Sequence, residues 1–368
     1  MRVAIDARML TGTAMHGIAR YVLQLLRGLV KEQSSLELFV LVGRDTPLPG
    51  LLGNEAARQP TFITCGSPWI SIGEQGELPR LLRRQRIDLF HSPSFVALLG
   101  CSIPQLLTIH DLNHLALPHY YSPLHRLYYE QVVKRVARRA PLVLTVSRFS
   151  QGELCRWLSK KPDQVVVTYN GVDASFKRVE DPLSRSFVKR HYRLPESFIF
   201  CLGSSRPHKN NRALLEAYER SQVSLPLVIS TPPAELGQLI LAAKNKGSEV
   251  IALPFIDDAH LPTIYSLAEL LVFPSLYEGF GLPALEAMAC GCPVLLSESS
   301  SLPEIAGEFG FYFDPLNVEA MAQGLRATLA QLGRETAERR EQRIKHARSF
   351  TWDRLVHDTV ATYERFLQ

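Results

Sequence analysis

The stretch Ser275-Leu-Tyr-Glu-Gly-Phe-Gly-Leu-Pro-Ala-Leu-Glu-Ala-Met-Ala-Cys-Gly-Cys-Pro293 lies between two short apolar runs, at 270–273 and 293–296. Apolar runs of this length suit buried strands, and Pro283 is allowed in the first turn of a helix. The stretch therefore predicts a loop and a short helix, 283–290, between two strands. A strand, a crossover helix and a second strand form the building unit of a parallel sheet.

The same alternation extends along the chain and forms two series. The first predicts strands at 3–5, 36–42, 88–90, 106–109, 142–146 and 164–169, and helices at 18–30 and 122–140. The second predicts strands at 198–202, 225–230, 250–253, 270–273 and 293–296, and helices at 212–220, 283–290 and 318–332; a charged stretch to 348 and a last helix, 352–367, follow. Strands that alternate with helices predict parallel sheets covered on both faces.

The two series indicate an α/β fold of two Rossmann-like domains. Between 174 and 196 the pattern fades, and Asp181-Pro182 and Leu194-Pro195 interrupt it. We therefore expect an N-terminal domain at 1–173, a C-terminal domain at 174–350 and a final helical segment at 351–368. Ligands of open parallel sheets bind beyond the carboxyl ends of the strands, so the loops there are the candidate site.

The composition fits a globular protein. The chain has 368 residues, of which 46% are hydrophobic and 21% charged, and its six cysteines include no C-x-x-C pair, which argues against a disulfide scaffold or a zinc site. Asp6 interrupts the first apolar run, and no run approaches the 18 apolar residues of a membrane span. We expect a cytoplasmic protein that is soluble or peripheral at the inner face of a membrane.

The net charge of +5 is unevenly distributed. Residues 1–173 carry +7 and residues 174–368 carry −2. Basic side chains gather at 80–86 and along the predicted helix 122–140, where apolar residues separate them. This pattern suits an anionic membrane surface, and a solvated helix face is the alternative interpretation.

Two carboxylates stand eight residues apart in the first stretch, at Glu278 and Glu286. A loop and a helix start gather backbone N–H groups, which suits a phosphate. Carboxylates repel phosphate, so these two suit hydroxyl groups instead, as a sugar would offer. Taken alone, they could equally be a capping acid and a solvated helix acid. The sequence contains no G-x-G-x-x-G and no Walker P-loop, which disfavours a dehydrogenase or an NTPase.

Glu-x7-Glu around Gly-Phe-Gly-Leu resembles the signature of glycosyltransferase family 4. Five further motifs follow the order of that family, each at a predicted strand end: Gly17-Ile-Ala-Arg-Tyr, His110-Asp111, Thr145-Val-Ser-Arg-Phe-Ser, Asn170-Gly-Val-Asp173 and Gly203 through Asn210. The resemblance covers almost the whole chain. Within the family, the chain looks most like the bacterial transferases that build O-antigen and other surface polysaccharides.

This resemblance implies a GT-B fold, in which two Rossmann-like domains face each other across a cleft and the last helix returns to the first domain. It implies that the first domain binds the acceptor and the second holds the nucleotide-sugar donor. It implies a hexosyltransferase that retains the anomeric configuration. The implied donor is a nucleotide-sugar, GDP-mannose, with UDP and ADP sugars left open, and the implied acceptor is a lipid-linked saccharide or oligosaccharide. It implies no cofactor and no metal, which agrees with the lack of an Asp-x-Asp motif.

The resemblance also assigns roles to residues of the second domain. Glu286 would hold the ribose hydroxyls, and Glu278 would face the donor sugar. Lys209 would neutralise the diphosphate leaving group, where a fixed cation lowers the barrier. Members often carry an arginine directly after the glycine at 203; here that position is Ser204, and Arg206 is expected to substitute.

In the first domain, His110 would face the donor sugar, and Asp111 either orients the imidazole or caps a helix. Donor binding would also involve Gly17, Gly203, Ser204 and the backbone amides of Phe280, Gly281 and Leu282, while Gly12, Ser147 and Asn170 would line the cleft.

Two other classes of protein are alternatives to the transferase. A nucleotide-sugar epimerase can share the fold, but the Glu-x7-Glu loop argues against it. A nucleic-acid-binding protein would explain the basic half and would place exposed aromatic rings beside the cations. We expect no nucleic-acid partner.

Overall fold

The computed structural model describes residues 1–366 apart from 12–16, 33–35, 45, 47–51, 53–59, 205, 232–236, 238–239, 241–248 and 254–255. The chain divides into two compact units. Unit 1 comprises Met1–Gly171 and Trp352–Gln368, and unit 2 comprises Val172–Thr351. These divisions lie within two residues of the boundaries expected from the sequence.

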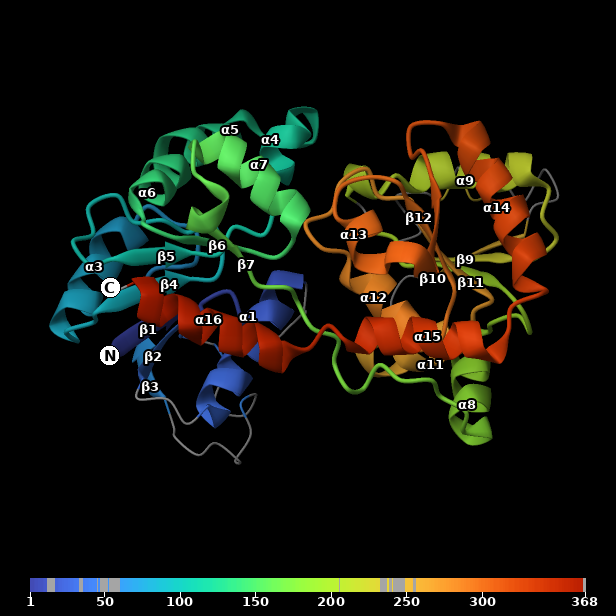
Figure 1. The fold of residues 1–368 in the computed structure, drawn as a ribbon, viewed down its shortest axis with the longest axis horizontal. Coiled ribbons are helices and arrows are strands. Elements are labelled where there is room, and N and C mark those ends of the chain that lie inside the picture. Colours follow the sequence, from blue (N-terminus) through green and yellow to red (C-terminus); the bar gives the residue numbers. More distant parts are fainter. Residues whose placement is uncertain are drawn as a thin grey trace. The chain divides into compact units, whose positions relative to one another are not determined.

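Unit 1 is built on a parallel sheet with the strand order β3-β2-β1-β4-β5 (Figure 1). Its strands are β1 Arg2–Asp6, β2 Glu37–Val42, β3 Thr61–Thr64, β4 Leu89–Ser92 and β5 Gln105–Leu107. A second parallel pair, β6 Val143–Thr145 and β7 Val165–Val167, continues the edge through a bridge between Thr108 and Leu144. The central strand is β1, whose Val3 pairs with Leu38 on β2 and Leu89 on β4.

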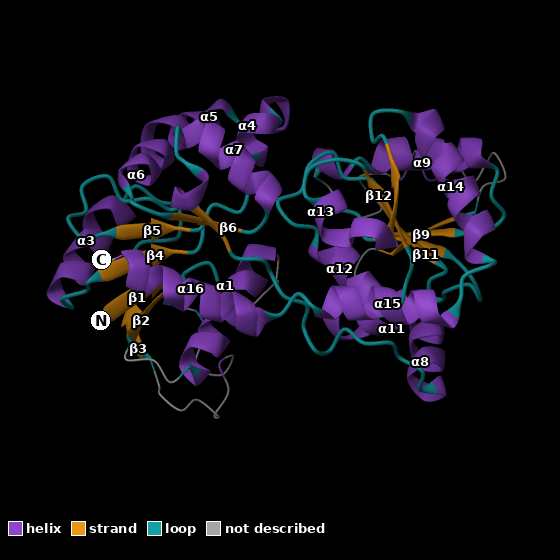
Figure 2. Cartoon of the chain, viewed as in Figure 1, coloured by secondary structure: helices purple, strands orange, loops and turns teal. Residues whose placement is uncertain are grey.

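Helices flank the strands of unit 1 (Figure 2). They are α1 Gly17–Lys31, α3 Glu74–Arg84, α4 Asn113–Ala116, α5 Pro123–Tyr128, α6 Lys134–Arg139, α7 Arg148–Leu158 and α16 Trp352–Phe366, with a π-helical turn, Tyr129–Val133, between α5 and α6. The last helix, α16, packs beside α1, and Gly28 permits this approach because a Cβ there would lie 2.2 Å from Val356 Cγ2. The hydroxyl of Tyr363 on α16 also lies 2.7 Å from Nδ1 of the buried His91 on β4.

Unit 2 repeats the arrangement with the strand order β10-β9-β8-β11-β12-β13, again parallel throughout. Its strands are β8 Ile199–Cys201, β9 Leu227–Ser230, β10 Val250–Leu253, β11 Leu270–Phe273, β12 Val294–Ser297 and β13 Gly310–Phe313. Its helices are α8 Pro182–Tyr192, α9 Asn211–Ser221, α11 Leu261–Leu267, α12 Leu282–Ala289, α13 Leu302–Ala306, α14 Val318–Leu332 and α15 Ala337–Arg348. In both units the parallel strands bring their carboxyl ends to one edge of the sheet.

The structure corrects the interpretation of residues 174–196, which contain the helix α8. The Asp181-Pro182 pair starts this helix: the Asp181 carboxylate accepts the Ser184 N–H at 2.8 Å, and Pro182 occupies the first turn. Arg193 ends the helix in a left-handed conformation. The same residue types that interrupt a periodic pattern also cap helices, and composition alone does not separate the two uses.

Other elements had no counterpart in the sequence analysis: β3, α3, α7, α11, α13 and β13, and the charged stretch that forms α15. The pattern of α15 is concealed because one of its inward-facing residues is an arginine. Arg343 is buried, pairs with Glu335 at 2.5 Å and donates to the carbonyl of Gly291 at 2.8 Å. A buried charge can face the interior when it is paired and hydrogen-bonded in this way.

Across the part of the chain that the structure describes, no helix is long and apolar enough to cross a membrane.

Candidate active site

The carboxyl ends of two neighbouring strands of unit 2, β8 and β11, bring together two side chains predicted from the sequence. The Lys209 ammonium lies 2.6 Å from Oε1 of Glu278. The two side chains are 18% and 14% exposed, so water screens this ion pair only partly. The family resemblance implied one residue at the diphosphate and the other at the sugar, and it did not predict contact between them.

Lys209 is held by the turn that contains it. The His208 carbonyl accepts the Leu276 N–H at 2.8 Å, which ties this turn to the loop after β11. Asn210 adopts a left-handed conformation with φ of 57°, and its side-chain amide donates to the Pro315 carbonyl at 2.9 Å. The ammonium also lies 4.9 Å from the ring centroid of Phe273, a favourable cation–π contact.

Three consecutive serines after β12 hold the loop that carries Glu278. The Ser300 hydroxyl accepts the Glu278 N–H at 2.9 Å, and the Ser299 hydroxyl donates to the Leu276 carbonyl at 2.8 Å. The buried Ser301 hydroxyl lies 2.8 Å from the Phe280 carbonyl and 3.0 Å from that of Glu278. The sequence analysis missed these serines, although a serine run directly after a predicted strand was the available signal.

Glycine is required at two positions of this site. Gly281 has φ of +101°, and a Cβ there would lie 2.6 Å from Leu302 Cδ2. At Gly203 a Cβ would lie 2.9 Å from the Asn211 amide nitrogen and 3.0 Å from the Ser230 carbonyl. Both constraints come from the protein's own packing, in addition to any close approach by a ligand.

His208 sits beside the ion pair as a neutral group. Burial, together with the neighbouring Lys209 charge, lowers its pKa to about 4. A neutral imidazole adds no second positive charge next to Lys209, so the ammonium remains the fixed cation of this turn.

The other predicted residues of unit 2 differ in accessibility. Glu286 lies on α12 and is only 3% exposed, whereas Arg206 is exposed on the loop that follows β8. The Ser204 hydroxyl accepts the Arg206 N–H at 3.3 Å, and the Ser204 carbonyl accepts the Asn211 side-chain amide at 2.8 Å. Phe280 is buried, and its ring packs edge-on against Phe350 with centroids 6.0 Å apart; Leu282 begins α12 after the Gly281 cap.

His110 is the central predicted residue of unit 1, and it lies just beyond the end of β5. Its Nε2 lies 3.0 Å from the Pro93 carbonyl, and its ring packs edge-on against Tyr21 with centroids 4.8 Å apart. Burial lowers its pKa to about 4, so at neutral pH Nε2–H donates to Pro93 and Nδ1 carries the lone pair. The His110 carbonyl accepts the Ser150 hydroxyl at 3.0 Å.

Two further predicted residues of unit 1 hold nearby backbone. Asp111 accepts the Asn113 N–H at 3.0 Å, but Leu112 is the N-cap residue of α4, so this is a turn contact beside the helix start. Ser147 caps α7 by accepting the Ser150 N–H at 3.1 Å. Asn170 is buried, and its Oδ1 has no hydrogen-bond partner in the described residues.

Two glycines of unit 1 were predicted as site residues, and the structure describes one of them. Gly17 is the first residue of α1, and a Cβ there would meet no atom of the described chain within 4 Å. Gly12 lies outside the described residues. The predicted site residues thus form two groups, one at the sheet edge of each unit.

Comparison with known proteins identifies the family to which this site belongs. Residues 15–176 match the family described as Glycosyltransferase Family 4, and residues 185–350 match Glycosyl transferases group 1. The chain is 31% identical over 298 residues to the O-antigen chain mannosyltransferase B of Escherichia coli, an alignment that covers 77% of this chain and 76% of that protein. The chain belongs to glycosyltransferase family 4.

Two further similarities extend this assignment. The family 4 chain is 32% identical over 253 residues to the MMP alpha-(1->4)-mannosyltransferase of Mycolicibacterium hassiacum, covering 66% of this chain and 59% of that protein. Its fold resembles that of the Anabaena protein Alr3699/HepE, solved in complex with UDP-glucose, with a TM-score of 0.74, 17% identity and 99% and 100% of the two chains covered. The chain is thus a hexosyltransferase with a GT-B fold, and the epimerase and nucleic-acid-binding alternatives gain no support.

Proposed function

We propose that this enzyme transfers mannose from GDP-mannose to a lipid-linked saccharide or oligosaccharide during the synthesis of a bacterial surface polysaccharide. The contact between Lys209 and Glu278 carries the proposal, because an ammonium suited to a diphosphate lies beside a carboxylate suited to sugar hydroxyls. Similarity to two mannosyltransferases, one of them an O-antigen enzyme, supports mannose and the polysaccharide. The complex of Alr3699/HepE with UDP-glucose supports a nucleotide-sugar donor.

In this proposal unit 2 holds the donor. Lys209, with Arg206 beyond it, neutralises the diphosphate, and the N–H groups at the start of α12 after Gly281 add partial positive charge. Glu278 accepts hydrogen bonds from the donor sugar, and Glu286 accepts them from the ribose. The serine contacts that fix the Glu278 loop keep these groups in place before the substrate arrives, and such preorganisation lowers the barrier.

The leaving group requires no metal ion in this proposal. Negative charge grows on the nucleoside diphosphate as the glycosidic bond breaks, and Lys209 is already fixed where that charge would develop. The neutral Nδ1 of His110 is suited to accept a hydrogen bond from a sugar hydroxyl, since burial keeps that imidazole uncharged.

We further propose that the reaction retains the anomeric configuration by attack on the face that the diphosphate leaves. A double displacement needs a carboxylate aimed at the anomeric carbon. Glu278 is paired with Lys209, and Asp111 accepts the Asn113 N–H, so neither carboxylate is assigned that task. Intact-protein mass spectrometry after donor mixing should show no glycosyl adduct, and anomeric NMR should show an α-linked product; an adduct on either acid would contradict the scheme.

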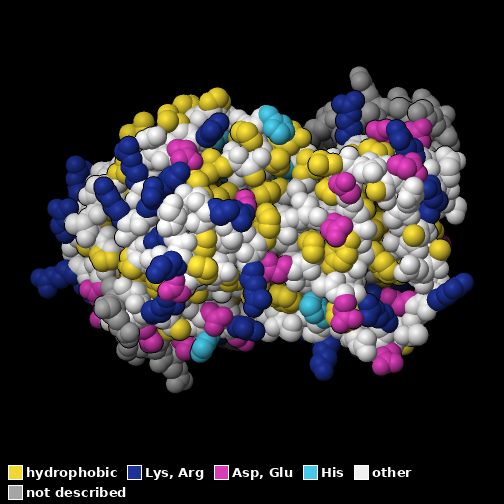
Figure 3. Space-filling view, turned by 45° about the horizontal axis from the view of Figure 1, so that its top comes forward, with side chains coloured by type: hydrophobic (Ala, Val, Ile, Leu, Met, Phe, Trp, Pro, Cys, Tyr) yellow, Lys and Arg dark blue, Asp and Glu magenta, His cyan; other side chains and the backbone are white. Residues whose placement is uncertain are grey.

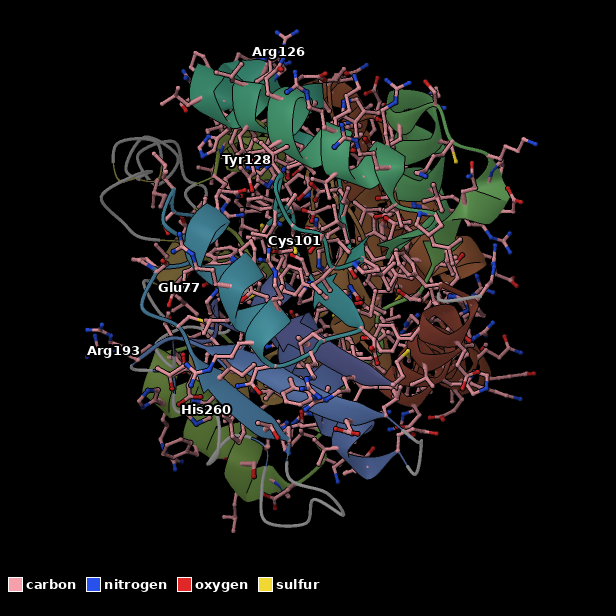
Figure 4. All side chains as sticks on the ribbon, turned by 90° about the vertical axis from the view of Figure 1, so that its left-hand side faces the viewer. Glu77, Cys101, Arg126, Tyr128, Arg193 and His260 are labelled. Carbon is pink, nitrogen blue, oxygen red and sulfur yellow. The ribbon has the colours of Figure 1, made fainter. Side chains whose placement is uncertain are left out.

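The enzyme is proposed to work at the inner face of a membrane through the basic surface of unit 1. On α5, Leu124 and Leu127 are 74% and 55% exposed beside Arg126, and α6 adds exposed arginines. Figure 3 shows Lys and Arg side chains interspersed with hydrophobic ones on this face, and Arg126 points outward at the rim in Figure 4. Cations flanking exposed leucines suit an anionic lipid surface that carries the acceptor.

A thermal-shift screen tests the donor. A ligand that binds only the folded protein raises the melting temperature according to RT ln(1 + [L]/Kd). GDP and GDP-mannose should give the largest shifts among nucleoside diphosphates and their sugars. Shifts by UDP or ADP alone would reject the donor base, and a wild-type protein that consumes none of these sugars would reject the proposed function.

A further inference from the structure

A set of polar side chains lies in the core of unit 1 and has no part in the mechanism proposed above. Its five members are Tyr21 on α1, His91 on β4, Thr108 directly after β5, and Thr359 and Tyr363 on α16. Each of them is 0% exposed. They meet, although they are far apart in the chain, because α1 and α16 pack together (Figure 1). We call this set the buried polar network.

Short contacts join the members of the network in a fixed order. The Tyr363 hydroxyl lies 2.7 Å from His91 Nδ1. On the other side of the same ring, His91 Nε2 lies 2.8 Å from the Thr108 hydroxyl oxygen. That oxygen lies 3.2 Å from the Tyr21 hydroxyl. The contacts therefore connect α16 to α1 through the two strands between them.

Tyr21 is the junction of the network, and its hydroxyl is fully used. It hydrogen-bonds Thr168 and Thr359 as well as Thr108. Thr359 gives its own hydrogen to the Leu355 carbonyl at 2.7 Å, so toward Tyr21 it can only accept. Tyr21 therefore donates to Thr359 and accepts from the other two threonines, which uses its one hydrogen and both of its lone pairs.

The direction of the remaining hydrogen bonds follows from Tyr21. Because Thr108 donates to Tyr21, it must accept from His91 Nε2–H. Burial lowers the pKa of His91 to about 3, so the ring is neutral and its Nδ1 accepts the Tyr363 hydroxyl hydrogen. Each hydroxyl and ring nitrogen of the network thus has a partner. A fully satisfied network of this kind holds one arrangement of its side chains.

The ring of Tyr21 connects the network to His110. The two rings are perpendicular, at 87°, with centroids 4.8 Å apart. The Pro93 carbonyl holds His110 Nε2 at 3.0 Å, but one hydrogen bond alone allows the imidazole to tilt about it. The Tyr21 ring packed against the imidazole opposes this tilt. The direction of His110 Nδ1 therefore depends on where Tyr21 is held.

We propose that Tyr21 is a positioning residue for sugar transfer and that the network anchors it to α16. Held at its hydroxyl, the Tyr21 ring keeps His110 Nδ1 directed at a hydroxyl group of the donor sugar. The inference rests on the proposed function, which assigns that hydroxyl group to His110. It gives Tyr363 a part in the reaction, although none of the site residues assigned above lies on α16.

Hydrolysis of GDP-mannose by the full chain, with water as the acceptor, tests the effect on the reaction. Tyr21→Phe and Tyr363→Phe each remove one hydroxyl and keep the ring. Both should lower kcat about 10-fold, because a misdirected hydrogen bond weakens the transition state most, and should leave the KM for GDP-mannose within about 2-fold. The matched control is Tyr218→Phe, which removes a buried hydroxyl of unit 2 that donates to the Leu225 carbonyl at 2.8 Å. Its kcat should equal that of the wild type.

The imidazole itself reports whether Tyr21 orients it. Protein labelled with ¹⁵N in its 11 histidines gives ring-nitrogen NMR signals, and His110→Gln identifies those of His110. In the wild type these signals should show a hydrogen on Nε2 only, because that nitrogen donates to Pro93. Tyr21→Phe and Tyr363→Phe should move them toward an average of the two tautomers, since a tilted ring loses this bond. Tyr218→Phe should leave them unchanged.

Thr108→Val serves as a second variant where a tyrosine variant does not fold. It removes the hydroxyl between His91 and Tyr21 at nearly constant volume, and it should act in the same direction. An unchanged kcat in the folded variants overturns the proposal, and so do unchanged His110 signals, since a purely structural network would lower only the melting temperature. Failure of the proposed function is distinct. The wild type would then hydrolyse no GDP-mannose, while the His110 signals would still decide whether the network orients the imidazole.

Discussion

The two units share the order of their first five strands, yet the carboxyl edges of their sheets carry different chemistry. In unit 2, the ends of β8 and β11 present an ammonium and a carboxylate in contact. In unit 1, the ends of β3, β4 and β5 present half-buried rings and a neutral histidine. The topology fixes where a ligand can bind, and the side chains after each strand decide which ligand it is.

The largest effect is expected at the carboxyl edge of the unit 2 sheet, where Lys209 lies. Lys209→Ala should reduce turnover about 10²–10³-fold, the scale of losing one group that stabilises transition-state charge. The melting temperature should fall to some extent, because the Glu278 carboxylate, 14% exposed, loses its partner, so turnover is measured below the melting temperature of the variant. The control is Lys189→Ala, which removes another partly exposed lysine of unit 2, paired with Glu196, away from this edge. Near-normal turnover of a folded Lys209→Ala protein would remove unit 2's charge from the mechanism.

The two glutamates of the same edge should separate in their effects. Glu286→Gln should lower nucleoside diphosphate affinity about 10-fold, because hydrogen bonds to a charged acceptor are lost. Glu278→Gln should cut transfer about 100-fold and largely spare that affinity, because in the proposal Glu278 accepts hydrogen bonds from the donor sugar and not from the nucleotide. Calorimetry on both variants, with Glu196→Gln as control, checks this division. Equal losses of affinity would show that it is wrong.

Acid should destabilise unit 1 through its buried histidines. Burial lowers the pKa of His91 to about 3 and that of His110 to about 4, and both lie in unit 1. Below pH 6.5 the unfolded chain protonates this histidine while the folded chain keeps it neutral, so the free energy of unfolding falls as the pH falls. For the buried His91 this loss should be about 2 kcal/mol between pH 6.5 and pH 5. Urea titrations at the two pH values, followed by tryptophan emission from unit 1, measure this loss. His91→Gln should make the unfolding transition less sensitive to pH. If the pH dependence of the variant equals that of the wild type, His91 is not its source.

The basic face of unit 1 should make a smaller contribution. Each cation near an anionic lipid surface contributes about 1 kcal/mol, so Arg138→Ala should weaken binding to phosphatidylglycerol vesicles about 5-fold. Arg190→Ala removes an exposed arginine from α8 of unit 2 and should have no effect. Co-sedimentation at low and physiological salt measures both variants. If both variants bind the vesicles equally well, the exposed face of α6 contacts solvent and not a membrane.

The smallest expected effect is that of a chelator. With the diphosphate charge met by Lys209, activity should survive excess EDTA unchanged. If EDTA abolishes activity and Mg²⁺ or Mn²⁺ restores it, a metal ion and not Lys209 neutralises the diphosphate.

The sequence predicted the strands well because each is a short apolar run bounded by polar residues. β3, Thr61–Thr64, and β13, Gly310–Phe313, are exceptions: both are edge strands with one buried residue each, so their patterns are weak. Helices with few buried residues were missed for a related reason, as in α8, where only Val188 is buried. Such helices depend on capping and on tertiary contacts, which a periodic pattern does not record.

By itself the sequence determined the α/β class, the two series of strands and the family, because local apolar runs and the spacing of a few motif residues carry that information. Only the tertiary structure decided that Lys209 contacts Glu278, that the serines after β12 hold the loop that carries Glu278, and that four rings from three strands lie together. These contacts join residues far apart in the chain, from Arg8 with Glu74 to Lys209 with Glu278. Their geometry follows from strand register and packing, which no single stretch of sequence specifies.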